Sequence, residues 1–218
     1  LDTPPYTHTP DTMKILSIAI ARLTPEERAA SADNEPVVLS QAFEVSEFGF
    51  FQRSGVREFL TFCTKTFTKR TKSGSRQVVE HEGYLCHVQM KANGLGMCVI
   101  TDKEYPGRVA FSLINDTLMK FEEACGKLWA SAQANAFDTF EPVVHAINHF
   151  QDPQEADKIC KIQKQLDDTM NVMHQTIDKV LERGVKLDDL VERSKDLSGQ
   201  SKMFYKTSKG MNSCCVIS

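Results

Sequence analysis

The sequence predicts an α+β domain with a mostly antiparallel sheet, followed by a long heptad-repeat helix. Two observations support this fold class. Residues 13–104 contain five short segments rich in Val, Ile and aromatic residues, which is typical of strands, and helical patterns lie between and after them. Residues 152–211 instead keep an apolar spacing of three and four residues, which is typical of a coiled coil. The change of period near residue 150 divides the chain into two parts.

The first part begins after residues 1–12, LDTPPYTHTPDT, which are rich in proline and threonine. We interpret them as a disordered extension, or as translated upstream sequence, and exclude them from the fold. The five predicted strands cover residues 13–23, 36–43, 76–82, 84–92 and 95–104. The polar loop at 24–36 is long, and we expect it to be mobile. The sequence NGLG at 93–96 predicts a hairpin turn before the last strand.

Helices are predicted at 55–69 and at 106–125, where Pro106 suits a first turn, and a weaker one near 138–149. The first helix has one apolar stripe made by Val56, Phe59, Leu60, Cys63 and Phe67. Phe62 lies about 120° from the centre of this stripe. It is therefore either a singly exposed apolar residue or a contact for a partner.

The second part has sixteen seam positions at heptad spacing, of which ten are apolar. They are Ile159, Ile162, Leu166, Thr169, Met173, Thr176, Val180, Arg183, Leu187, Leu190, Ser194, Leu197, Ser201, Phe204, Ser208 and Met211. A helix of this length spans about 80 Å and would not fit within the first domain. A neighbouring apolar column, made by Met170, Ile177, Val191 and Tyr205, favours contact with more than one partner helix. Because the small seam residues and Gly184 weaken the isolated helix, we expect disorder until partners bind.

Arg183 is the charged residue of this seam, with seven layers before it and eight after it. A charge buried there is costly unless it is satisfied, and an arginine can only donate hydrogen bonds. Partner helices would therefore have to supply acceptors at this level, and such a polar layer fixes the register. The alternative is an arginine that bends out to solvent.

The chain ends in Cys215-Val216-Ile217-Ser218, which fits the C-a-a-X pattern for prenylation, and the terminal serine favours farnesyl. Cys214 is an adjacent thiol that could carry a second, removable lipid. One lipid chain binds a membrane marginally, whereas two chains anchor stably. Lys202, Lys206 and Lys209 would add attraction to anionic lipid, since no acidic residue follows position 196.

Several classes of protein are disfavoured. The net charge of −3 gives no case for nucleic acid, and the longest apolar run, residues 15–21, is too short to span a bilayer. Seven cysteines without a C-x-x-C spacing indicate scattered thiols in a reducing compartment, not disulfides or a metal site. A prenylated GTPase would need a G-x-x-x-x-G-K-[ST] loop, which is missing. His145 and His149 could share a helix face but lack the glutamate of a zinc protease motif, so we expect no enzyme.

Three features together identify the chain as similar to the R-SNARE family: VLERGVKLDDL around Arg183, the sixteen layers, and the terminal CCVIS. FGFFQRSGVREFLTF, TDKEYPGRVAF and SKMFYK resemble the prenylated longin-type members. The resemblance implies a profilin-like longin domain at 13–150, with a five-stranded sheet and helices on both sides. It further implies a SNARE motif at 152–212 and a lipidated tail at 213–218.

The same resemblance implies that Arg183 meets three glutamines of Q-SNAREs in a four-helix bundle, that Cys215 is farnesylated and that Cys214 is palmitoylated. The expected function is fusion of intracellular vesicles, for example between the endoplasmic reticulum and the Golgi. Such a protein would be cytoplasmic and peripheral on the cytosolic face of Golgi, endosomal or vacuolar membranes. SNARE disassembly and tethering machinery would be further partners, and covalent lipids would take the place of cofactors. The alternative is a lipid-anchored coiled-coil adaptor without fusion activity, which the pairing of Arg183 would discriminate.

A cytosolic pool of such a protein must hide its farnesyl chain. The longin domain is the packed surface available in the same chain, and tethering gives it a high effective concentration. We therefore expect a closed state in which the SNARE segment folds back over the helix at 55–69, with an apolar groove at Phe62.

Overall fold

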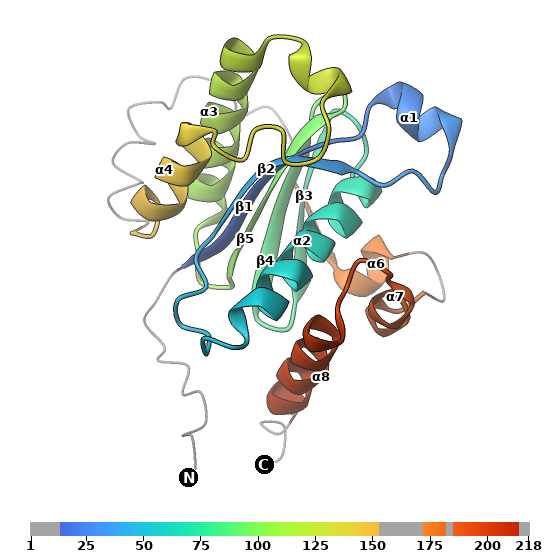
Figure 1. Ribbon diagram of the computed structural model, residues 1–218, viewed down its shortest axis with the longest axis vertical. Helices are drawn as coiled ribbons and strands as arrows, with labels where there is room; N and C mark the ends of the chain where they lie inside the picture. Colours follow the sequence, from blue (N-terminus) through green and yellow to red (C-terminus); the bar gives the residue numbers. More distant parts are fainter. Residues whose placement is uncertain (1–13, 153–171, 182–184, 214–218) are drawn as a thin grey trace.

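The computed structural model describes residues 14–152, 172–181 and 185–213. At its centre lies a sheet with the strand order β2-β1-β5-β4-β3-β6 (Figure 1). Five of these strands come from the first part of the chain: β1 (Ile15–Arg22), β2 (Val37–Phe43), β3 (Ser75–His81), β4 (Tyr84–Met90) and β5 (Leu95–Asp102). Neighbours among these five are all antiparallel, which confirms the predicted sheet.

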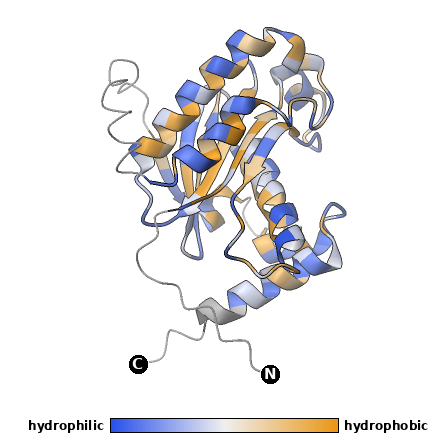
Figure 2. Ribbon diagram, turned by 60° about the vertical axis from the view of Figure 1, so that its left-hand side comes forward, coloured by the Kyte–Doolittle hydropathy of each residue, from blue (hydrophilic) through white to orange (hydrophobic). Residues whose placement is uncertain are grey.

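Helices cover both faces of the sheet. On one face lie α3 (Gly107–Cys125), the short 3-10 turn η1 (Leu128–Ser131) and α4 (Glu141–His149), and on the other lies α2 (Arg53–Arg70). Side chains alternate along each strand, so that Ile18 and Ile20 of β1 pack with the α3 side while Leu16 packs with the α2 side. Figure 2 shows the mostly apolar strands in orange between these helices. The α+β fold class is thereby confirmed.

The hairpin predicted at residues 93–96 is present between β4 and β5. Gly94 has a φ of +86°, and a Cβ at this position would lie 2.5 Å from the carbonyl oxygen of Leu23. That carbonyl is close because the backbone N–H of Leu23 donates to the carbonyl of Gly94 at 2.9 Å. A side chain is therefore excluded both by conformation and by space.

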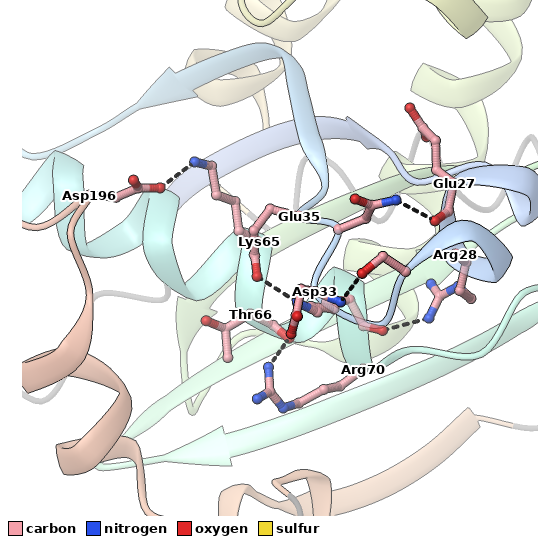
Figure 3. Close-up of polar contacts among 11 residues, drawn as sticks. Glu27, Arg28, Asp33, Glu35, Lys65, Thr66, Arg70 and Asp196 are labelled. Atoms are coloured by element: carbon pink, nitrogen blue, oxygen red, sulfur yellow. Dashed lines mark hydrogen bonds and ion pairs between the residues drawn. The ribbon is translucent and has the colours of Figure 1, made fainter.

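The segment at 24–36 is not the long mobile loop that we expected. It contains helix α1 (Pro25–Ala30), which begins with a capping box between Thr24 and Glu27. Arg28 then donates to the carbonyl oxygens of Lys69 and Thr71, at 2.6 and 3.2 Å. These carbonyls belong to the C-terminal end of α2, where such acceptors have no partner within the helix (Figure 3). The segment at 24–36 is thus held in place because Arg28 caps the C-terminal end of α2.

The second part of the chain differs most from expectation. Instead of one continuous helix over 152–212, the described residues form strand β6 (Val172–Thr176) and three helices, α6 (Ile177–Val180), α7 (Leu187–Arg193) and α8 (Gly199–Ser213). They are neither extended away from the first domain nor disordered, but pack against it on the α2 side, as the expected closed state requires. The apolar side chains of this part are buried on the surface of the first domain, where they join the cluster beneath α2. Within the described part of the chain, no helix is both long and apolar enough to cross a membrane.

Candidate functional site

The candidate site is the surface where the described C-terminal residues, 172–181 and 185–213, meet α2 and the sheet; we call these residues the docked segment. Strand β6 pairs in parallel with β3, from Arg76 opposite Val172 to Glu80 opposite Thr176. The amide of Gln175 also donates to the Gln77 side chain at 3.1 Å. β3 would otherwise be a free edge strand, so β6 covers its unpaired backbone groups.

The helices of the docked segment continue the apolar cluster beneath α2. Their buried members are Ile177, Leu181, Leu187, Val191, Leu197 and Tyr205. They join the α2 residues Val56, Leu60, Cys63 and Phe67, which lie on the predicted stripe. The two helices lie close together at Gly55, where a Cβ would lie 3.2 Å from the side chain of Gln200. Gly55 thus lets the start of α8 lie directly against the first turn of α2.

The docked segment uses the residues that we predicted for contact with partner helices. Of the seam, Leu187, Leu197 and Ser201 are buried, and Val180, Leu190, Ser194, Phe204 and Ser208 are half-buried. The neighbouring column is buried at Ile177, Val191 and Tyr205. Met173 and Thr176 of β6 are exposed. The same side chains therefore could not bind partner helices without leaving this surface.

Some predicted site residues lie outside the described residues. These are Ile159, Ile162, Leu166, Thr169, Arg183, Cys214 and Cys215, together with the extension at 1–12. The side chain of Met211 belongs to the same group, although its backbone is part of α8.

Aromatic rings make the contact between α2 and α8. Phe59 lies 5.2 Å from the ring of Tyr205 and 6.1 Å from that of Phe204, both on α8. Phe204 also meets Phe48, in the loop before α2, at 5.7 Å. Edge and tilted arrangements at these spacings are favourable for aromatic pairs.

Phe59 is the contact residue that sequence reasoning missed, because its spacing placed it with the core stripe. In the structure it is only partly buried by its own domain and is turned toward α8. Phe62 stacks on Phe59 with ring centroids 6.2 Å apart. It lines an open groove that also includes Phe43, Thr61 and Asp196. Most of the residues that line this groove are polar or charged, so the apolar groove expected at Phe62 stays a prediction, whereas the aromatic contact with α8 belongs to Phe59.

A carboxylate on α2 holds the N-terminal end of α8. Glu58 accepts from the backbone N–H of Ser198 at 3.0 Å and from the hydroxyl of Ser201. Burial raises the pKa of Glu58, but the hydrogen bonds from Ser201 and Ser198 outweigh this and hold the pKa below its usual value. An acidic group at this position is favourable because the first turn of a helix has unpaired N–H groups. Glu58 thus acts as a cap supplied by another part of the chain.

One ion pair joins the docked segment to α2, and a second holds α8 to α7 within the segment. Lys65 of α2 lies 2.7 Å from Asp196, and Figure 3 shows the two side chains pointing toward one another. Lys209 and Tyr205 of α8 both donate to Asp188 of α7, and the hydrogen bond from Lys209 is the main reason that the Asp188 pKa is lowered. Pairs as exposed as Lys65 and Asp196 contribute little stability, so they orient the segment more than they hold it.

His81, at the end of β3, stacks against the ring of Tyr205 with centroids 6.3 Å apart. Burial lowers the pKa of His81. Glu82, Asp188 and Asp178 oppose this shift, whereas Lys209 adds to it. Burial thus disfavours the charged form of the imidazole, and the charged groups of the docked segment act on it in both directions.

Family models match both parts of the chain. A model described as Longin, a regulated-SNARE-like domain, matches residues 45–144, and a model described as Synaptobrevin matches residues 158–217.

Similar proteins cover nearly the whole chain. The VAMP-like protein YKT61 of Arabidopsis thaliana is 46% identical over 205 residues, which is 94% of this chain and 100% of the relative. The synaptobrevin homologs YKT6 of Debaryomyces hansenii and ykt6 of Schizosaccharomyces pombe are each 43% identical over 207 residues, again 94% of this chain and 100% of the relative.

Proposed function

Because the chain belongs to the synaptobrevin family of SNARE proteins that carry a longin domain, we propose that it is an R-SNARE that drives fusion of intracellular vesicles. Its seam, with Arg183 at the central layer, zips with Q-SNARE helices into a four-helix bundle. Burial of the apolar layers supplies the work that brings two membranes together. The Arg183 guanidinium donates to glutamine side-chain oxygens of the partners, which fixes the register of the sixteen layers.

This proposal rests on the observation that the same seam residues serve two different contacts. Leu187, Leu197 and Ser201 are buried on the longin domain, although heptad spacing assigns them to a helical bundle. Docked and zipped states therefore exclude one another at these layers. The longin domain acts as an intramolecular inhibitor that competes with Q-SNAREs, and complete zipping requires that α8 leave α2.

Membrane attachment is assigned to the C-terminal tail. Cys215 carries a farnesyl group and Cys214 a palmitoyl group, and these covalent lipids attach the protein to the membrane. One chain gives reversible binding and two give stable binding, so removal of the second lipid returns the protein to the cytosol. The site of action is the cytosolic face of Golgi, endosomal or vacuolar membranes, where tethering and disassembly machinery act on the same complex.

The decisive experiment tests the central layer by a double-mutant cycle. Arg183→Gln should lower the melting temperature of the complex with Q-SNAREs, because the central layer then loses the arginine that donates hydrogen bonds to the partner glutamines. A Gln→Arg change at the same layer of one partner should restore it. The two changes would be additive if Arg183 pointed to solvent, and that outcome would favour an adaptor without fusion activity.

A further inference from the structure

An exposed aromatic pair lies in the loop that precedes α2. Phe50 is 75% exposed and Phe51 is 84% exposed, and their rings meet edge to face at 5.5 Å. Single exposed apolar residues are ordinary, but two adjacent phenylalanines at a loop tip present a continuous apolar surface. The pair takes no part in the contact with the docked segment through its rings.

The loop holds these rings outward. Arg53 donates to the carbonyl oxygens of Phe48 at 3.0 Å and Ser46 at 2.6 Å, which closes the loop from within. The backbone N–H of Gln52 adds a 2.7 Å hydrogen bond to Gly49. Phe48 packs on Phe204, so the sequence Phe-Gly-Phe-Phe places one ring inward and two outward. Exposure of the pair is therefore a built feature and needs no rearrangement.

The same end of the molecule carries the start of α8. The side-chain amide of Gln200 donates to the carbonyl oxygen of Phe51, and Met203, on the next turn of α8, is 70% exposed. Figure 1 shows the loop before α2 and helix α8 together at the lower end of the fold. We call Phe50, Phe51 and Met203 the aromatic patch. From Gln200 to Ser213 the helix rises about 20 Å, and Cys215 follows within about 7 Å of extended chain.

The charge of the residues near the aromatic patch favours a lipid bilayer over a protein as its binding partner. From Leu197 to the end of the chain there are three lysines and no acidic residue. Lys202 and Lys206 flank Met203 along α8, and Arg57 is exposed one turn into α2. At the interface of an anionic membrane the rings would enter the acyl boundary while Lys202 and Arg57 meet the headgroups; Lys206 lies 3.1 Å from Glu192, and Glu47 is the exposed acidic residue of the same loop.

We propose that the aromatic patch inserts into the membrane interface and gives the docked form a second membrane contact beside its C-terminal anchor. The inference rests on the proposed function only in assuming that an anchor brings this end to a bilayer. Tethering then raises the effective concentration of the patch at the surface, so weak insertion suffices. The longin domain would thereby be oriented on the membrane before the SNARE segment is released.

The test uses the full chain without lipids, tethered by a C-terminal histidine tag to vesicles of phosphatidylcholine, phosphatidylserine and a nickel-chelating lipid. Because Trp129 is the only tryptophan of the chain and is buried, Trp129→Phe removes the background signal and Phe51→Trp introduces a reporter. We expect a blue-shifted emission on tethering and quenching by lipids brominated along the acyl chain. A reporter at Leu128, which is 74% exposed in η1, is the matched control and should show neither change.

A second measurement follows binding without the tether. Phe50→Ser combined with Phe51→Ser should lower the partition of the untagged chain onto the same vesicles about tenfold or more, while Leu128→Ser should not. Circular dichroism checks that each variant is folded. The proposal is overturned if the Phe51 reporter stays in water on tethered vesicles, or if the double serine variant binds as well as the parent. It is also overturned if sedimentation shows that the patch joins two copies of the chain. None of these measurements depends on farnesylation, so a result that overturns membrane insertion of the patch leaves the proposed function untouched.

Discussion

Replacement of Phe59 by alanine should release α8 while leaving the longin domain intact. Phe59 faces two rings of α8, those of Phe204 and Tyr205, and the pairing of aromatic rings contributes about 0.5–1.5 kcal/mol for each contact beyond area burial. The docked state should therefore lose about 1–3 kcal/mol relative to the open state, which raises the ratio of open to docked molecules about 5- to 150-fold.

Native-state hydrogen exchange on the full chain measures this ratio directly. Amides of α8 should exchange faster by the same factor in Phe59→Ala, because they open when the segment leaves. Amides of β1 and β5 lie in the centre of the sheet and should keep their protection. Phe50→Ala removes a phenylalanine that makes no ring contact with α8, and it is the control. Unchanged exchange in α8, or an equal loss of protection in β1 and β5, would refute the reasoning.

Three further predictions concern the docked state and the anchor. Phe62→Glu places a carboxylate in the groove beside Asp196. Hydrogen exchange over residues 185–213 should therefore rise several-fold, and the membrane-bound fraction of the protein should grow. Equal protection from exchange in the variant and the parent would contradict this. Burial lowers the pKa of His81 from 6.5, so the docked state binds fewer protons and loses stability as the pH falls from about 6.5 toward the lowered pKa. Protection of α8, corrected for intrinsic rates, should thus fall between pH 7.5 and 5.5, and less so in His81→Gln. Finally, intact mass from a eukaryotic host should show no farnesyl in Cys215→Ser but a retained farnesyl in Cys214→Ser; an unmodified parent chain would oppose lipidation.

The five antiparallel strands and the three main helices of the longin domain could be predicted because their periodicity reports burial within one domain. Val56, Leu60, Cys63 and Phe67 are buried as their spacing indicates. Helix α1 was missed because six residues are too few for a periodic signal, and its stability comes from the Thr24 cap and the contact of Arg28 with α2. A polar composition alone could not reveal that contact.

The C-terminal segment could not be predicted by the same means. A heptad pattern describes the bundle that the residues form with partners, and the same apolar side chains fit a second surface when partners are absent. Phe59 illustrates the limit. Helical spacing groups it with core residues, but it lies at the margin of the stripe, where a neighbouring element decides whether the ring faces the sheet or α8. Phe62, which stacks on Phe59, was the feature of the sequence that could have revealed this contact. Packing of α2 on the sheet does not require two phenylalanines three residues apart on one side of the helix.

The placement of β6 has a kinetic consequence for release. Met173 and Thr176 face solvent while Leu187, Leu197 and Ser201 are buried, so among the described residues an incoming bundle finds uncovered layers at the beginning of the docked segment. Their capture competes with the short ladder between β6 and β3 and with the hydrogen bond from Gln175 to Gln77. Each layer gained there removes one support from the next, and α8 is displaced last. The docked segment is therefore displaced stepwise from β6 toward α8, so that inhibition sets the rate of assembly and its direction along the seam as well as lowering the free energy gained on completion.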